Sequence, residues 1–342
     1  MRGCFPVMNG GDGVILSKRG DVCYGWEVEL PPAFRCNEER YDAIVQALFS
    51  AVTLLPDYTV VHKQDVYMKK KYVAQKSDGL LQEAYERHFD GREYLDHRCR
   101  LFLIFSSKKN VRGASSGLLG ISAGGSMPKA EVLARYAAMV EQFATVVQGC
   151  GLLEMRRLTE DDIFGVGDFP GLIQDYLNFT DEGEDVLSDI QMRRDRVRTG
   201  DRYIGCHLIA DLDQLPAEVA SCRKVTSLST DSSAVNLSFL NEIGQELDCE
   251  HIVNHFILKE PQKDIHGELD TRRRQMLSMA GRSAENRMYA DEINEFLENS
   301  ASEQMFTVKF HINILSGAPV DESGRASDMV TAAISKMGIT PV

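Results

Sequence analysis

The sequence predicts an α+β fold of two mixed or antiparallel-sheet units with helices packed on the sheets. Runs of β-branched and aromatic residues alternate with amphipathic helical segments. Residues 1–155 and 203–342 each contain the order strand, helix, strand, helix, which is typical of a ferredoxin-like split βαβ half. The chain has 342 residues, more than the ~250 that a single core usually supports. Residues 156–202 lack clear periodicity, and we expect them to connect the two units.

The first unit begins with two strands and a helix. Strands over Gly13–Leu16 and Val22–Leu30 flank a turn at Lys18–Asp21. Asn37 is a good N-cap for the helix that follows, because acidic residues occupy its first turn. The apolar residues of this helix recur at helical spacing: Tyr41, Ile44, Val45, Leu48 and Val52.

A strand over Thr59–Met68 follows, and neither of its faces is cleanly apolar. It carries His62, Lys63, Gln64 and Asp65 in succession. Such a strand usually lies at a sheet edge or beneath an element that pairs with its polar groups. The sequence leaves both arrangements open.

Further elements complete the two units. The first unit should add a helix over Leu80–Phe89, a central strand over Arg98–Phe105, a loop over Ser106–Met127 and a helix over Lys129–Gly149. The second unit should contain strands over Tyr203–Ala210, Val235–Leu240, His251–Leu258 and Phe306–Leu315. We also expect a long helix over Asp270–Glu298 and a short one over Ser327–Met337.

Composition narrows the function classes. With 43% hydrophobic and 26% charged residues, the chain resembles an ordinary soluble globular protein. The net charge of −13 argues against strong binding to duplex nucleic acid, which requires Lys and Arg to neutralise phosphates. Eight scattered cysteines with no CxxC pair favour reduced thiols in a cytoplasmic protein. No apolar run is long enough for a membrane span, so any membrane location should depend on partners.

Two glycine-rich matches could carry catalysis. Gly120–Gly125 is the nearest approach to a phosphate-binding P-loop, but Ser126 and Met127 stand where Lys and Ser or Thr are required. Gly113–Gly117 fits the G-x-S-x-G elbow of serine hydrolases, which makes Ser115 a candidate nucleophile. That elbow needs a strand directly before the serine and a helix directly after it, and the neighbouring residues predict neither. A mobile surface loop is the competing interpretation of both matches.

Histidines and cysteines offer no strong metal site. His251 and His255 lie four residues apart, but on a strand this spacing separates them by ~10 Å or more. Half-buried structural roles are the more typical outcome for them. His88, His97 and Cys99 form a looser cluster with the same interpretation. We therefore predict no catalytic, cofactor-binding or metal-binding residues.

An arginine run is the best candidate contact site for a partner or a phosphate. It comprises Arg193, Arg194, Arg196, Arg198 and Arg202, and a second group comprises Arg272–Arg274. These side chains could contact nucleic-acid phosphates or an acidic protein surface. Alternatively they form solvated ion pairs with nearby acids: Asp185, Asp189, Asp195, Glu268 and Asp270. Given the net charge, a protein partner is favoured over DNA.

Several separated blocks resemble the N-terminal region of TraG-type ATPases of conjugative transposons. The clearest are LPDYTVVHKQD at Leu55–Asp65 and YERHFDGREYLDH at Tyr85–His97. Shorter blocks lie before and after these two, and all the blocks occur in the same order as in that family: EVELP at Glu27, LTEDDIFG at Leu158, GLIQDYLNF at Gly171, LSTD at Leu228 and HIVNHFIL at His251. The resemblance covers nearly the whole chain.

This resemblance implies a non-catalytic docking and assembly domain of an ATPase similar to the large ATPase of type IV secretion systems. The P-loop of the family lies downstream of the matching region, so ATP and magnesium would belong to a motor domain beyond Val342. The expected partners are inner-membrane components of a conjugation machine, the chain's own C-terminal ATPase domain and further copies of the chain. The location would be cytoplasmic and peripheral at the inner membrane. A serine hydrolase using Ser115 and a nucleic-acid-binding module using Arg193 to Arg202 are the alternatives.

Overall fold

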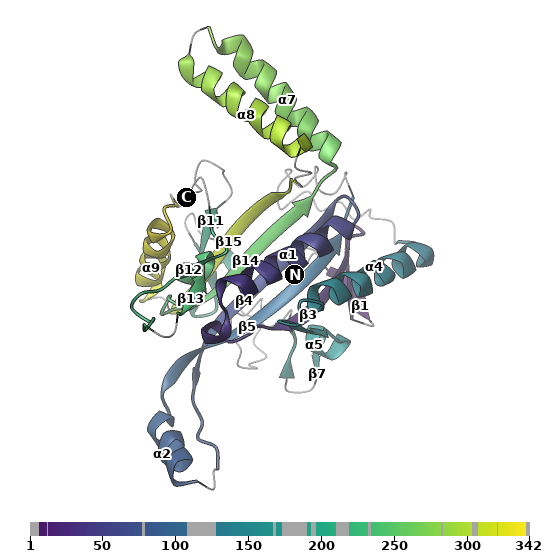
Figure 1. Ribbon diagram of the computed structural model, residues 1–342. Helices are drawn as coiled ribbons and strands as arrows, with labels where there is room; N and C mark the ends of the chain where they lie inside the picture. The colour runs from purple at the N-terminus through teal and green to yellow at the C-terminus, as the bar shows by residue number, and fades with distance from the viewer. Residues whose placement is uncertain are drawn as a thin grey trace.

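The computed structural model describes residues 7–11, 13–76, 79–107, 128–166, 169–172, 190–192, 196–209, 219–231, 234–281, 283–302, 307–319 and 321–339. Helices pack against one large antiparallel sheet (Figure 1). The strand order of this sheet is β1-β2-β3-β5-β4-β14-β15-β11-β10-β9, and β6 pairs with β3 beside β2. The α+β prediction is confirmed.

The strands of this sheet are β1 (Val7–Gly11), β2 (Val14–Ser17), β3 (Val22–Glu29), β4 (Thr59–Lys71), β5 (Glu93–Phe105), β6 (Glu154–Arg157), β9 (Ile190–Met192), β10 (Val197–Thr199), β11 (Arg202–Ile209), β14 (Glu250–Lys259) and β15 (Lys309–Pro319). Two small sheets pair β7 (Gly165–Val166) with β8 (Phe169–Pro170) and β12 (Cys222–Lys224) with β13 (Asn236–Ser238). The α-helices are α1 (Glu38–Leu54), α2 (Leu80–Phe89), α4 (Ala130–Gln148), α5 (Glu160–Phe164), α7 (Gln262–Met279), α8 (Ala284–Ser302) and α9 (Ser323–Lys336). Short 3₁₀ helices are η1 (Ala33–Arg35) and η4 (Phe239–Ile243).

The first half of the chain forms a β-α-β-β-α-β unit. Its elements follow as β3, α1, β4, β5, α4 and β6, and its strands lie in the order β6-β3-β5-β4. The turn between β2 and β3 and the helix after Asn37 occur where the sequence predicts them. The Asn37 side chain accepts a hydrogen bond of 3.1 Å from the backbone N–H of Arg40, which caps α1.

The second half repeats part of this arrangement. Strands β14, β15 and β11 lie in the same relative order as β4, β5 and β3, and α9 follows β15 as α4 follows β5. Where the first unit has α1, the described residues between β11 and β14 form β12, β13 and η4. The segment between the units contributes β9 and β10, which extend the sheet beyond β11.

The two units share the sheet because β4 pairs with β14. Nine residue pairs join these strands, from Thr59 opposite Lys259 to Tyr67 opposite His251. Strand β4 therefore lies in the middle of the sheet, between β14 and β5. Of the two arrangements left open by its polar sequence, the edge position is excluded.

Two hydrophobic clusters lie on the same face of the sheet. The first packs α1 and α4 against β3, β4 and β5, with Phe143 and Leu103 at its centre. The second packs α9 against β11, β14 and β15, with Ile314 and Ile334 at its centre. The opposite face carries smaller clusters, one of which packs Ile163 of α5 on Phe102. Each half of the chain thus buries its own set of apolar side chains.

Two hairpins extend beyond the sheet as arms. Strands β4 and β5 continue to pair as far as Lys71 and Glu93, past the last residue that pairs with β14, and they carry α2 between them. The α7–α8 hairpin connects β14 to β15 in the same way. Because β4 and β14 are antiparallel, the two arms leave the sheet at opposite ends (Figure 1).

The prediction of one long helix over Asp270–Glu298 is wrong. Helix α7 ends at Met279 and α8 begins at Ala284. The Ser283 hydroxyl accepts a hydrogen bond of 3.4 Å from the Asn286 N–H at the start of α8. Gly281, close to this cap, is a poor helix former and favours a turn here. The prediction missed this turn because helical periodicity continues on both sides of it.

A buried lysine joins the two units at the end of α1. Lys259, the last residue of β14, is 7% exposed. Its ammonium group donates hydrogen bonds to the carbonyl oxygens of Thr53 (2.7 Å) and Val52 (3.4 Å). These carbonyls lie in the last turn of α1, where carbonyl groups lack helical partners and the helix dipole favours a cation.

We expect Lys259→Met to lower the free energy of unfolding by about 2 kcal/mol, because methionine leaves these buried carbonyls without a charged donor. Urea unfolding monitored by circular dichroism would measure the change. Lys263→Met is the control, because Lys263 is exposed on α7. Equal stability of the two variants would show that Lys259 does not stabilise the junction.

Candidate functional site

A groove of about 940 Å³ lies at the root of the β4–β5 arm. It is bounded by β4, the start of β14, the end of β15 and the first turns of α9. We call it the basic groove, since six of its lining residues are basic: Lys69, Lys70, Lys71, Arg98, Arg202 and Arg325. Its acidic lining residues are Glu93, Asp248, Glu250 and Glu322. The groove is thus a local excess of positive charge on an acidic protein.

Ion pairs hold part of this charge in place. Lys70 and Arg98 both approach Asp96, at 2.8 and 3.7 Å. Arg202 of β11 forms an ion pair with Glu250 of β14, which also accepts a hydrogen bond from the backbone N–H of Lys69. The contacts with Asp96 lie within the β4–β5 hairpin, whereas the contacts of Glu250 link the arm to β14 and β11.

Two basic side chains of the groove have no such constraint. Lys71 and Arg325 form no ion pair with any other residue that the structure describes. They come from different elements, the end of β4 and the first turn of α9. An anionic group entering the groove could therefore be bound from two sides without breaking an existing ion pair.

The structure places three arginines of the predicted run near this region. Arg202 lines the basic groove. Arg196 donates to the Ser323 hydroxyl at the start of α9 (3.2 Å) and stacks over Tyr203. Arg198 donates to the Gly200 carbonyl in the β10–β11 turn. The run therefore contributes one groove residue and two local contacts, and Arg193 and Arg194 lie outside the described residues.

The second arginine group lies on α7. Asp270 pairs with Arg273 at 2.7 Å and with Arg274 at 2.6 Å, one helical turn away. Neighbours at this spacing on an exposed helix form weak, solvated pairs. The solvated-face interpretation accounts for these two side chains.

Some of the candidates for catalysis and metal binding lie outside the described residues, and the others have contacts that the structure describes. Ser115 and the Gly120–Gly125 segment lie outside the described residues. His251 and His255 lie on one face of β14, where His251 stacks on Tyr67 and His255 contacts the edge of Phe310. His97 lies in β5, whereas His88 lies on α2 in the arm, so the structure does not bring these two together. Among the described residues no group of three potential ligands could hold a metal ion.

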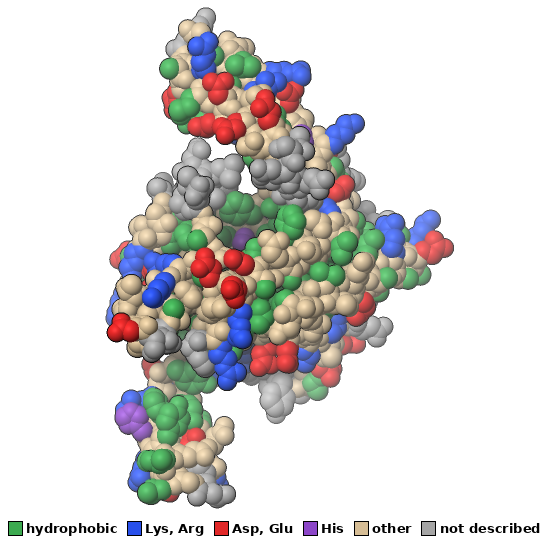
Figure 2. Space-filling model, viewed as in Figure 1, with side chains coloured by type: hydrophobic (Ala, Val, Ile, Leu, Met, Phe, Trp, Pro, Cys, Tyr) green, Lys and Arg blue, Asp and Glu red, His purple; other side chains and the backbone are tan. Residues whose placement is uncertain are grey.

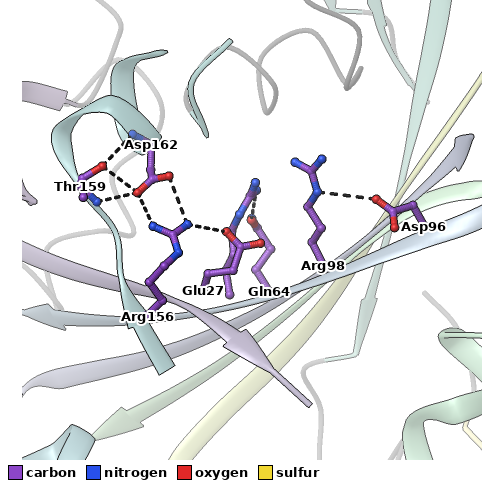
Figure 3. Close-up of polar contacts among 8 residues, drawn as sticks. Glu27, Gln64, Asp96, Arg98, Arg156, Thr159 and Asp162 are labelled. Atoms are coloured by element: carbon purple, nitrogen blue, oxygen red, sulfur yellow. Dashed lines mark hydrogen bonds and ion pairs between the residues drawn. The ribbon is translucent and has the colours of Figure 1, made fainter. Parts of the chain in front are cut away.

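A row of polar side chains crosses six strands on the face opposite α1, α4 and α9. Cross-strand partners share a face of a sheet, and register aligns Arg156, Glu27, Arg100, Gln64, Asn254 and Asn313. The Asn254 amide donates to Asn313 (2.8 Å) and accepts from Gln64 (3.1 Å). At the other end, Asp162 of α5 binds the Arg156 guanidinium at 2.8 Å (Figure 3). Hydrogen bonding of this kind makes burial of a polar row tolerable.

A stack of rings runs beside the polar row. Phe102, His62, Phe256 and His311 occupy consecutive strands, with ring centroids 5.3, 4.1 and 4.6 Å apart. His62 also hydrogen-bonds to Asn254 at 2.9 Å. Burial disfavours the imidazolium and lowers the pKa of His62 to about 4. The ring is therefore neutral at physiological pH, as a stacked structural residue would be.

A charged cluster lies on the other face of β4 and β5. Lys63 pairs with Asp65, and His97 contacts the same carboxylate at 2.9 Å. Burial acts against the charged carboxylate, but Lys63 and His97 outweigh it and hold the pKa of Asp65 below its usual value. Burial also raises the pKa of the adjacent Cys99 thiol to about 12, so Cys99 is not an activated nucleophile. We interpret this cluster as structural.

No protein-family model matches the chain, and no curated protein matches it either. Functional inference therefore depends on the resemblance in its sequence and on the geometry described above.

The sequence carries signals for the groove and for the arm that the prediction did not use. Lys69–Lys71 is a run of three basic residues at the end of a strand. Leu80 and Leu81, each followed four residues later by Ala84 or Tyr85, place apolar residues on one side of α2. The remaining groove residues come from strands and from α9, which only the tertiary structure brings together.

Stability should fall as the pH decreases from about 6.5 towards 4. Burial lowers the pKa of His62, His251 and His255 from 6.5 to about 4 each, so the unfolded chain binds protons more readily in this window. Their contribution is complete above the unfolded pKa and is lost as the pH approaches the folded value. Each histidine should contribute about 1 to 3 kcal/mol to this loss. Chemical unfolding at several pH values would measure it.

His62→Phe should reduce the pH dependence while retaining a ring for the stack. His88→Phe is the matched control, because it makes the same replacement at an exposed position on α2. If both variants keep the full slope, His62 is not one of the groups responsible.

Proposed function

We propose that this chain is a docking and assembly domain of a conjugation-type ATPase and has no catalytic activity of its own. The observation that carries the proposal is the pair of arms that leave one rigid sheet at opposite ends. A sheet that pairs continuously across both halves of the chain provides a stiff body, and the arms extend from it as contact surfaces. The blocks that resemble the TraG-type N-terminal region support the particular machine.

The proposed partners are inner-membrane components of the transfer machine, the chain's own C-terminal ATPase domain and further copies of the chain. The basic groove suits an acidic segment of a partner, because Lys71 and Arg325 are available on two sides of it. Among the helices that the structure describes, none has the length and apolar composition of a membrane span. In this proposal the domain lies on the cytoplasmic side and is peripheral to the membrane, and ATP and magnesium bind to the motor domain.

Charge reversal in the groove tests docking. Lys71→Glu combined with Arg325→Glu should weaken association with the inner-membrane components by roughly tenfold or more, because both positive groups are replaced by repulsive ones. Co-expression followed by purification in detergent would measure the association. The control is Lys224→Glu combined with Arg287→Glu, which changes the net charge equally at exposed sites elsewhere. An equal effect of both pairs would contradict specific docking at the groove.

Nucleotide binding gives an independent check. A ligand that binds only the folded state must raise the melting temperature. We therefore expect ATP with magnesium to leave the melting temperature of this chain unchanged in a thermal-shift assay. A concentration-dependent rise would show that the chain itself binds nucleotide, and the non-catalytic assignment would fail.

A further inference from the structure

Helix α2 presents an apolar stripe to the outside of the arm. Leu80, Leu81 and Tyr85 are 82%, 86% and 56% exposed. With Ala84 they occupy positions i, i+1, i+4 and i+5, which lie on one side of a helix. Val73, in the segment leading to α2, is 77% exposed. The end of the arm is therefore an apolar surface, which Figure 2 shows as hydrophobic side chains gathered on the lowest part of the molecule.

The side of α2 that faces the stem carries a carboxylate beside the half-buried Phe89, which contacts Tyr72. Glu86 is the only buried residue of the helix. Its carboxylate accepts hydrogen bonds from the Tyr72 hydroxyl at 2.8 Å and from the backbone N–H of Gln75 at 2.9 Å. A surface helix normally turns its apolar side inward and its polar side to water. These hydrogen bonds hold α2 in the reversed orientation, which exposes an apolar surface to which a partner can bind.

Charge distinguishes the possible kinds of partner for this apolar surface. Between Lys69 and Arg98 the sequence has seven basic and six acidic residues, a formal charge of +1, whereas the whole chain carries −13. Exposed basic residues near the tip flank the apolar stripe: Lys76, Arg87 and Arg92. An anionic surface would repel the rest of this acidic chain but would not repel the arm.

The shape of the arm favours a lipid surface. Helix α2 lies at the end of a narrow hairpin that projects from the sheet (Figure 1), so its exposed leucines can reach between lipid headgroups. Tyr85 and Tyr94 are 56% and 45% exposed, respectively, and tyrosine is typical of the headgroup level. Long basic side chains behind the tip can reach lipid phosphates while their methylene stems remain in the apolar layer.

We propose that the α2 tip inserts directly into the anionic surface of a lipid bilayer. This inference deepens the proposed docking function and rests on it, because it supplies a membrane contact in addition to the protein partners. Leu80 and Leu81 enter the boundary between headgroups and acyl chains, and the flanking lysines and arginines bind lipid phosphates.

Tryptophan fluorescence offers a direct measurement on the intact chain. Trp26 is the only tryptophan and is 3% exposed in the core, so it provides a constant background. In a Tyr85→Trp variant, vesicles of equal parts phosphatidylglycerol and phosphatidylethanolamine should shift the emission to the blue, and brominated lipids should quench it. Pure phosphatidylcholine vesicles should have little effect, and added salt should weaken binding. An unchanged spectrum with the anionic vesicles would overturn the proposal.

Substitutions locate the contact. Leu80→Asp combined with Leu81→Asp should reduce vesicle binding by roughly tenfold or more, because it removes the apolar stripe and adds negative charge. The matched control is Leu277→Asp combined with Met288→Asp on the opposite arm, where these residues are 45% and 52% exposed. Both sites are exposed, so folding should be preserved in each variant. Equal losses in both variants, or no loss at Leu80 and Leu81, would overturn the proposal.

Failure of this inference can be told apart from failure of the docking function. If the chain associates with the membrane components in detergent but does not bind vesicles, a protein partner covers the α2 tip, and only the lipid proposal fails. If the chain binds vesicles but none of the components, the lipid contact is supported and the docking proposal fails.

Discussion

The pairing of β4 with β14 is the interaction on which the rest of the structure depends. It joins strands from the two halves of the chain over nine residue pairs and makes a single sheet of two units. Without it, β4 and β14 would be exposed edge strands of their units, and exposed edges are sites for unwanted pairing. The antiparallel direction of this pairing also sends the two arms away from one another. The overall shape of the molecule therefore follows from one strand junction.

The junction is polar, and this has a physical consequence. Gln64 and Asn254 are cross-strand partners that are 4% and 1% exposed. Buried amides are costly unless hydrogen-bonded, and shifting the register by one residue would turn them to the opposite face. The polar row and the ring stack through His62 thus specify the register of β4 and β14 more strictly than an apolar seam would. Lys259 adds a further constraint, since it caps α1 only when β14 is in this position.

The β4–β5 arm and the basic groove both begin at the junction of β4 and β14. The basic groove forms where β4 leaves β14, so its lysines come from the strand that also supports α2. A partner bound in the groove would contact the root of the arm, and a surface that covers α2 would contact its tip. The two proposed contacts thus lie on one hairpin, which makes simultaneous binding to a protein partner and to a membrane geometrically consistent.

The sequence by itself determined the local elements and the fold class. Asn37 with Glu38 and Glu39 marks the start of α1, and α2 has the predicted bounds of Leu80–Phe89, because caps and helical periodicity are local properties. The sequence missed the turn between α7 and α8, since apolar periodicity on both sides of Gly281 resembles one helix. The tertiary structure alone decided that β4 is central and that Lys71 and Arg325 line one groove. These features depend on which distant strands pair, and pairing between residues nearly two hundred positions apart, such as Gln64 and Asn254, leaves no local pattern to read.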